Sequence, residues 1–348
     1  MESKNFNPDD VGVNNGNYFG FPFTTEDSDL VLLSAPWDVT TSYGGGAAFA
    51  PDAIIEASTQ LDFYDPDCPN IWQRGIATAD VDYSIQDRSA RLRAIAKRII
   101  ENLEHGGNVM ADYLLARQLK SINTAADELA VQLFTEADRL LSAGKIVGLV
   151  GGDHSTPLGV IKAVAKHHKG MGILHIDAHR DLRKAYEGFQ QSHASIMFNV
   201  LSEVPRVSRF VQVGARDYCS AEAELAATDE RVVSFEQALL DERRFAGESW
   251  SAVCQEIVEA LPKDVYISFD IDGLSPDNCP STGTPVPGGL SFGEAVHLIK
   301  SVVRSGRRIV GFDLVEVACG KMGDYDANVG ARMLYKLCCQ TLKSNPRE

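Results

Sequence analysis

From residue 145 onward, short apolar segments alternate with longer segments of helical pattern, and this rhythm is the strongest constraint on the fold. The apolar segments are hydrophobic along nearly their whole length rather than at every second position. Such strands are typical of parallel sheets that are buried on both faces by their connecting helices. The sequence therefore predicts an α/β fold with a parallel sheet. The expected strands are residues 145–150, 171–176, 209–213, 265–269 and 308–314, and the expected helices are 157–168, 195–201, 249–261, 292–305 and 327–342.

The first 143 residues are organised differently. Residues 1–27 have no steady period, and we expect an arm laid over the surface or against a neighbouring subunit. The apolar run at residues 30–33 predicts a buried strand, and Pro51 marks the start of a helix. Residues 85–143 are mostly helical in pattern, with breaks expected at Gly106–Gly107 and near Asn123. No linker divides the rest, so residues 28–348 are expected to form a single domain.

Composition narrows the function classes. The chain has 348 residues, 44% of them hydrophobic, which is enough to bury a large core. Its net charge of −15 argues against a nucleic-acid-binding surface. There is no apolar run long enough to span a membrane and no signal-peptide pattern at the N-terminus. The seven cysteines are scattered, which is typical of reduced thiols in a cytoplasmic protein.

Two short runs place metal-capable side chains directly after predicted strands. They are Asp177, His179 and Asp181 in the first run, and Asp270 and Asp272 in the second. Alternate side chains of an extended strand point to the same face, so we expect each run to project its side chains together. Carboxylates gathered in this way repel one another unless cations lie between them. The pattern predicts a divalent-metal site, with enough ligands for two metals.

Two further polar residues follow strands that end at the same edge of the predicted sheet. His154 comes after residues 145–150 and two glycines, and Glu316 comes after residues 308–314. Ligands of open parallel sheets bind outside the carboxyl ends of the strands, so these residues point to an active site. His175 is expected to face the other side of its strand and to serve the core or to support the ligands from behind.

Five motifs together resemble the ureohydrolase family, which contains arginase, agmatinase, guanidino-acid hydrolases and formimidoylglutamase. They are Gly-Gly-Asp-His-Ser at 151–155, Asp-Ala-His-x-Asp at 177–181, Ser-Phe-Asp-Ile-Asp-Gly-Leu-x-Pro at 268–276, Gly-Thr-Pro-Val-x-Gly-Gly-Leu at 283–290, and Asp-Leu-Val-Glu-Val at 313–317. The resemblance implies a three-layer α/β/α sandwich with a mostly parallel central sheet, a paired manganese site and a homo-oligomer, often a trimer or hexamer.

The resemblance also implies a ligand set for two divalent metals. One metal would be held by His154, Asp177, Asp181 and Asp270, and the other by His179, Asp177, Asp270 and Asp272. Carboxylates with one imidazole per metal suit Mn²⁺ better than Zn²⁺ or Cu²⁺, because no thiolate contributes. Ni²⁺ is the alternative.

The family reaction is hydrolysis of a C–N bond at a guanidinium or amidine carbon. On this resemblance Asp181 orients the attacking group, His193 passes a proton to the departing amine, and Glu316 pairs with the cationic nitrogens of the substrate. The expected partner is therefore a small cationic guanidino or formimino compound. Taken alone, His193 is a weak signal that also fits a surface histidine, and Glu316 also fits a surface salt bridge.

Arg183 is the residue from which we infer which group the substrate carries on its tail. Arginase-like members carry a neutral amide two positions beyond the last acid of the Asp-Ala-His-x-Asp motif, and here that position is Arg183. A guanidinium can grip a carboxylate in bidentate fashion, so we expect a carboxylate-bearing substrate, as for an arginase or a guanidino-acid hydrolase. The alternative is that Arg183 faces solvent or pairs with Glu187.

Other functions stay open at this point. A formimidoylglutamase would release formamide, and an agmatinase would act on a substrate without a carboxylate. The loop Tyr43–Gly46 departs from the Arg-Pro-Gly-Ala sequence usual in the family near the pocket rim, which adds to this uncertainty about substrate. From another class, a non-catalytic relative would bind metal or ligand without turnover. A single-metal zinc amidohydrolase of related fold is disfavoured by the presence of both His154 and Asp272.

Overall fold

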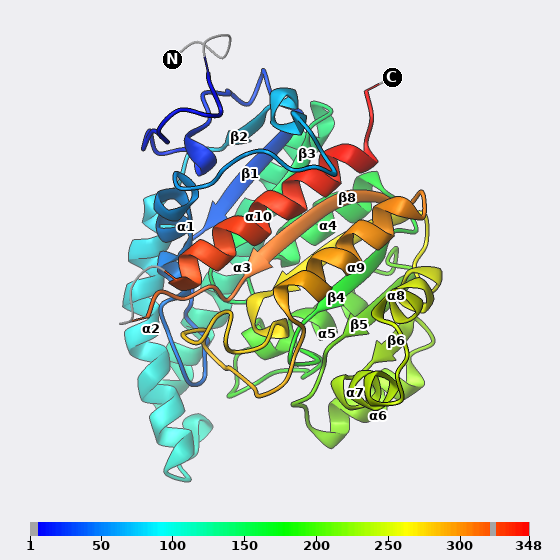
Figure 1. Ribbon diagram of the computed structural model, residues 1–348. Coiled ribbons are helices and arrows are strands. Elements are labelled where there is room, and N and C mark those ends of the chain that lie inside the picture. The colour runs from blue at the N-terminus through cyan, green and yellow to red at the C-terminus, as the bar shows by residue number, and fades with distance from the viewer. Residues whose placement is uncertain (1–5, 321–324, 348) are drawn as a thin grey trace.

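The computed structural model describes residues 6–320 and 325–347, and within them a single parallel sheet forms the centre of the molecule (Figure 1). Its strand order is β2-β1-β3-β8-β7-β4-β5-β6. The strands are β1 (Leu30–Ala35), β2 (Ile76–Thr78), β3 (Ile146–Gly151), β4 (Gly172–Ile176), β5 (Arg209–Val213), β6 (Val232–Phe235), β7 (Asp264–Asp270) and β8 (Arg308–Val315). The five strands predicted after residue 143 are confirmed to within one residue at each end.

Helices cover both faces of the sheet, which confirms the three-layer α/β/α prediction (Figure 1). One face packs against α1 (Ala50–Ser58), α7 (Gln237–Phe245), α8 (Trp250–Glu259), α9 (Phe292–Arg304) and α10 (Tyr325–Ser344). The other packs against α2 (Tyr83–Glu104), α3 (Tyr113–Ser142), α4 (Leu158–His167) and α5 (Ile196–Glu203).

Strand β1 shows why the apolar runs are continuous. Leu30 and Leu32 belong to the core on one side of the sheet, while Val31 and Leu33 belong to the core on the other. Successive side chains of a strand alternate between faces, so a strand buried on both sides must be apolar at every position. Each such aliphatic side chain contributes about 1.5–3 kcal/mol to stability on burial.

The predicted helical region forms a long hairpin of α2 and α3 that extends past the sheet (Figure 1). The break at Gly106–Gly107 is confirmed, because α2 ends at Glu104 and Gly106 has a φ of 75°. The break predicted near Asn123 is wrong, since α3 runs through it. Asn123 lies on the polar side of α3, where its side chain donates to the carbonyl of Gly188 and accepts from the backbone N of Gln190. The polar side chain of Asn123 therefore makes a contact with another segment and does not mark the end of a helix.

Sequence reasoning missed four short elements: β2, β6, α7 and α6 (Ser220–Thr228). Strand β2 has three residues at one edge of the sheet, and β6 lies at the other edge with three of its four residues only half-buried. Edge strands this short carry little hydrophobic pattern of their own. Their place is decided by pairing with β1 and β5.

Part of the predicted N-terminal arm is buried against its own chain. Tyr18 and Phe19 are buried, and the Tyr18 hydroxyl lies 2.8 Å from Ser34 Oγ on β1. The backbone N of Phe19 donates to Ser58 Oγ at the end of α1. A domain boundary at residue 27 stays a prediction. Among the helices of the described residues, none is long and apolar enough to cross a membrane.

Gly159 and Gly293 offer a matched test of helix packing, because each is the second residue of its helix. A Cβ on Gly159 would lie 2.1 Å from the carbonyl oxygen of Ala130 on α3, whereas a Cβ on Gly293 would meet no atom of the described residues within 4 Å. We expect Gly159→Ala to lower the free energy of unfolding by about 2 kcal/mol or more, because the helices must separate. Gly293→Ala should raise it by about 0.5–1 kcal/mol. Urea unfolding measures both, and equal stability of the two variants would contradict the packing.

Candidate metal centre

The predicted site residues lie at the carboxyl ends of the four central strands, β3, β8, β7 and β4. His154 follows β3, and Glu316 directly follows β8. Asp177 directly follows β4, and Asp270 is the last residue of β7. Because these strands are neighbours in one parallel sheet, residues far apart in the sequence meet at one edge.

Three carboxylates converge on one nitrogen of His154. Its Nδ1 lies 2.9 Å from Asp177 Oδ2, 3.0 Å from Asp181 Oδ2 and 3.1 Å from Asp270 Oδ2. All four side chains are buried. Nδ1 and Asp177 Oδ2 have no hydrogen-bond partner of acceptable geometry among the described residues, although they lie so close together. The atoms point at a common centre rather than at each other, as ligands of one cation do.

The other nitrogen of His154 explains why Nδ1 is suited to bind a cation. Ser268 Oγ donates to Asp313 Oδ1 at 2.9 Å, which uses the only hydrogen of that hydroxyl. Ser268 Oγ lies 2.9 Å from His154 Nε2 and must therefore accept a hydrogen from it. The ring then presents a lone pair on Nδ1 toward the carboxylates. A histidine held from behind in this way is typical of metal ligands.

A second group of ligand atoms adjoins the first. His179 Nδ1 lies 3.2 Å from Asp272 Oδ2 and 3.5 Å from Asp177 Oδ1. Asp177 thus directs one carboxylate oxygen to each group. Asp177 with His179 and Asp272 forms one potential metal-binding set, and Asp177 with His154 and Asp181 contributes to the other. Two adjacent sets that share Asp177 fit a pair of cations.

The charges of the cluster favour bound cations. Burial alone would raise the pKa of Asp177, but His175, His154 and His179 hold it well below its usual range. Burial, together with Asp272 and Asp177, raises the pKa of Asp270 well above the ordinary value for an aspartate. These opposite shifts arise because acids this close cannot all be charged without positive charge between them. The donors are imidazole nitrogens and carboxylate oxygens, which fit a divalent metal of intermediate softness.

The local backbone differs from the predicted extended strands. Asp181 has a left-handed φ of 55°, and Ile271–Gly273 form a 3₁₀ turn after β7. The turn is closed by a hydrogen bond from the backbone N of Asp272 to Asp270 Oδ1 at 2.8 Å. The expectation that strand alternation brings these acids together is therefore wrong, although the acids do converge. Tight turns, rather than pleating, direct them inward.

His175 also differs from its predicted orientation. Its Nε2 lies 2.9 Å from Asp177 Oδ2, so it faces the cluster rather than the opposite side of the strand. Residues two apart in a strand share a face, and the sequence prediction overlooked this parity. Its Nδ1 lies 3.3 Å from Gln212 Nε2 on β5. The supporting role predicted for His175 stays a prediction.

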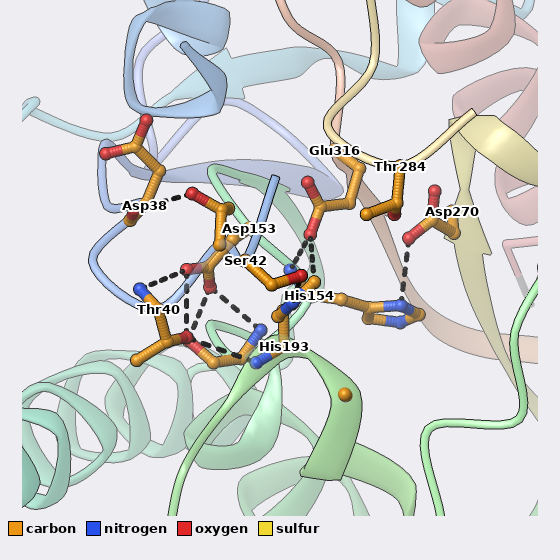
Figure 2. Close-up of polar contacts among 12 residues, drawn as sticks. Asp38, Thr40, Ser42, Asp153, His154, His193, Asp270, Thr284 and Glu316 are labelled. Carbon is orange, nitrogen blue, oxygen red and sulfur yellow. Dashed lines mark hydrogen bonds and ion pairs between the residues drawn. The ribbon is translucent and has the colours of Figure 1, made fainter. Parts of the chain in front are cut away.

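His193 and Glu316 lie together beside the cluster (Figure 2). His193 opens the 3₁₀ turn His193–Ser195, and its Nδ1 is 3.6 Å from Glu316 Oε1. Glu316 Oε1 also accepts from the backbone N of His154 at 2.9 Å. Glu316 Oε2 is buried and has no hydrogen-bond partner in residues 6–320 and 325–347. Glu316 adopts a left-handed φ of 60°, a strained conformation that is common at functional sites.

A cavity of about 140 Å³ opens beside these residues. It is lined by Ser42, His179, Asp181, Arg183, Tyr186, His193, Ala194, Asp217, Tyr218, Glu222 and Thr284. Sequence reasoning missed Ser42, Tyr186, Asp217, Tyr218 and Glu222 as site residues, whereas Thr284 lies in the motif at 283–290. Asp217 follows the predicted strand 209–213, so its place after a strand end was an available signal. Glu222 lies in a helix start and gave no such signal.

Arg183 lines the cavity but is already engaged. Its Nε lies 3.6 Å from Glu222 Oε2, and its guanidinium stacks over the ring of Tyr186 at 4.6 Å. The prediction that Glu187 would pair with it is wrong, because Glu222 takes that place. Glu222 is buried and also accepts from the backbone N of Leu182.

The sequence matches the Arginase family over residues 28–340. The chain belongs to this family. The match covers most of the chain and confirms the resemblance predicted from the five motifs. It also places His154, Asp177, Asp270 and Glu316 inside the region that the family shares.

Two relatives illustrate the likeness in sequence. The N(1)-aminopropylagmatine ureohydrolase of Thermus thermophilus is 32% identical over 313 residues, covering 89% of this chain and 88% of that protein. The agmatinase of Serratia proteamaculans is 30% identical over 336 residues, covering 92% of this chain and 93% of that protein.

Solved structures of the arginase-family fold are also similar. The agmatine ureohydrolase of Thermoplasma volcanium superimposes with a TM-score of 0.68 at 21% identity, over 92% of each chain. The formimidoylglutamase of Bacillus subtilis gives a TM-score of 0.66 at 18% identity, over 93% of this chain and 90% of that one. At these identities the likeness concerns the fold alone.

Asp177 is the residue whose loss should affect both groups of ligands. We expect Asp177→Asn to leave far less than the wild-type amount of metal after dialysis, because each potential site loses one charged oxygen. Metal content per chain, measured by mass spectrometry of the ions, checks this. Asp87→Asn, a change of an exposed acid on α2, is the matched control and should load like the wild type. Full loading of Asp177→Asn would contradict a bridging role.

Metal affinity should fall as pH decreases. Burial alone would lower the pKa values of His154 and His179, but the aspartates around them raise both well above the ordinary value. Protons therefore compete for these nitrogens, and binding a metal must displace them. We expect the dissociation constant to rise at least about tenfold per pH unit between about pH 8 and about pH 6. Isothermal titration calorimetry at several pH values measures this, and a pH-independent constant would contradict histidine ligation.

Proposed function

We propose that the chain hydrolyses a small guanidino compound to urea and an amine, with two divalent metals bound at the carboxyl edge of the sheet. The observation that carries the proposal is the pair of adjacent ligand sets sharing Asp177 beside a cavity. Membership of the arginase family makes the chain an enzyme of the ureohydrolase type, acting on C–N bonds of linear guanidino compounds.

The proposed metal ligands are those that the sequence predicted. They are His154, Asp177, Asp181 and Asp270 for one ion, and His179, Asp177, Asp270 and Asp272 for the other. When bound, such a pair of ions lowers the pKa of a shared water and so supplies a nucleophile near neutral pH. Mn²⁺ fits the carboxylate-rich donors best, and Ni²⁺ is the alternative.

Three residues are proposed to act on the substrate. Glu316 Oε2 is a buried acceptor without a partner in the described part of the chain, which suits the N–H groups of a guanidinium. His193 is proposed to pass a proton to the departing amine, because it lines the cavity and contacts Glu316. Burial alone would lower the pKa of His193, but Glu316 raises it, which favours the protonated form that donates. Asp181 is proposed to orient the nucleophile, since it lines the cavity and faces the first ligand set.

For the substrate tail, an agmatine-type compound is supported better than the carboxylate-bearing substrate expected from Arg183. Arg183 Nε lies 3.6 Å from Glu222 Oε2 and its guanidinium stacks on Tyr186, so Glu222 already balances its charge. Asp217 lines the same cavity and favours a cationic end. The relatives named for aminopropylagmatine and agmatine agree with this choice.

On composition and family, we also propose that the protein is a cytoplasmic homo-oligomer.

Substrates with the same guanidino end and different tails test the function and the tail together. We expect the Mn²⁺- or Ni²⁺-loaded enzyme to release urea from agmatine or aminopropylagmatine more efficiently than from arginine or guanidinobutyrate. Formimidoylglutamate and free guanidine complete the panel, with urea and formamide scored separately. Stoichiometric metal without turnover on any substrate would favour the non-catalytic relative, and formamide release would favour the formimidoylglutamase.

Asp217→Asn should weaken recognition of the charged tail of the substrate without slowing the chemical step. We expect the KM for agmatine to rise about fivefold with kcat unchanged, the size of one partly exposed charge pair of about 1 kcal/mol. Butylguanidine, which lacks the tail amine, is the matched control substrate and should be unaffected. An equal rise for both would contradict a role of Asp217 in recognising the tail. Arg183→Ala tests the alternative substrate. If this variant raised the KM for guanidinobutyrate and for no other substrate, the result would support binding of a substrate carboxylate by Arg183.

A further inference from the structure

The loop of residues 38–46 passes over the cavity and is closed on itself. The backbone N of Asp38 donates to Ser89 Oγ on α2 at 3.0 Å, and the backbone N of Gly46 donates to Asp38 Oδ2 at 2.8 Å. The Asp38 carboxylate thus joins the two ends of the loop, and Ser89 Oγ in turn donates to Asp38 Oδ1. Gly46, with a φ of 117°, makes the turn that allows this closure.

The middle of the loop is held from two further sides. Arg93 on α2 donates to the carbonyl of Val39 at 3.1 Å and also to the carbonyl of Thr41. Between them, the backbone N and the hydroxyl of Thr40 lie 3.4 Å from Oδ2 of the buried Asp153, to which both donate. The loop is therefore a rigid platform rather than a free surface segment.

This platform contacts His193 at two points (Figure 2). The backbone N of His193 donates to Thr40 Oγ1 at 3.2 Å, and the ring Nε2 lies 3.3 Å from Ser42 Oγ. On its other side, the ring Nδ1 lies 3.6 Å from Glu316 Oε1. Both ring nitrogens therefore face an oxygen. Ser42 is half-buried and, like His193, lines the cavity.

We propose that Ser42 is a positioning residue whose hydroxyl holds Nε2 of His193 and fixes the plane of the ring relative to the cavity. The inference rests on the function proposed above, in which His193 passes a proton to the departing amine. Glu316 alone, at 3.6 Å, leaves the ring free to turn about its Cβ–Cγ bond. The protonated ring donates Nε2–H to Ser42 Oγ, so the proton for the departing amine leaves from Nδ1, and a fixed ring keeps Nδ1 aimed at the cavity and raises kcat.

Kinetics of three variants test this role. We expect Ser42→Ala to lower kcat about tenfold, a fraction of what a positioned general acid contributes, with KM and metal content unchanged. Ser42→Thr keeps a hydroxyl and should restore most of the rate. Ser251→Ala makes the same change at an exposed residue of α8 and is the matched control with wild-type kcat. An unchanged kcat in Ser42→Ala, or an equal loss in Ser42→Thr, would overturn the inference.

A second measurement reads the contact without using activity. In protein loaded with diamagnetic Zn²⁺ in place of the paramagnetic Mn²⁺ or Ni²⁺ and labelled with ¹⁵N at histidine, the ring signals of His193 are identified by their loss in His193→Asn. We expect Ser42→Ala, but not Ser251→Ala, to shift the Nε2 signal, because Nε2 loses its partner. An unchanged Nε2 signal overturns the inference whatever the kinetics show. Failure of the wild type to cleave any guanidino compound would instead refute the proposed function, and the spectra would still decide the role of Ser42.

Discussion

The whole site depends on the repulsion between buried carboxylates that converge where four parallel strands end. Asp177, Asp181 and Asp270 all approach Nδ1 of His154 within about 3 Å. Charges this close in a buried setting repel strongly, and only intervening positive charge makes the arrangement stable. The hydrogen bonds around the cluster serve that requirement. Ser268 and Asp313 leave Nδ1 of His154 as an acceptor, and Nδ1 and Asp177 Oδ2 have no hydrogen-bond partner among the described residues.

The site also holds backbone strain that the rigid sheet can tolerate. Asp181 and Glu316 adopt left-handed backbone conformations although neither is glycine; Glu316 directly follows β8, and Asp181 lies in the segment after β4. Such residues cost about 1–3 kcal/mol each and persist only when their surroundings determine them strongly. Here the strain redirects two acids inward. Asp181 is turned toward the ligand cluster, and Glu316 is turned so that one oxygen is bound and the other is left for a ligand.

Helices outside the sheet support this edge from a distance. The α2–α3 hairpin extends past the sheet, yet Ser89 and Arg93 of α2 hold the loop that contacts His193. Asn123 of α3 is hydrogen-bonded to the segment that follows Arg183 and Tyr186. The hairpin is thus part of the framework of the cavity. Asn123, near which the sequence predicted a helix break, makes one of these contacts.

The sequence by itself determined the six inner strands, the parallel sheet and the cluster of acids and histidines, because doubly buried strands must be apolar throughout and metal-type ligands stand out where such strands end. It did not determine how the acids converge, which required the left-handed Asp181 and the turn at Ile271–Gly273. The sequence also favoured binding of a substrate carboxylate by Arg183. Glu222, the acid that Arg183 contacts in the structure, lies on a helix that has no hydrophobic pattern of its own, so no sequence pattern indicated this ion pair. Contacts between distant segments, such as Ser42 with His193, exist only once the chain is folded, since no local pattern encodes which side chains meet across an edge.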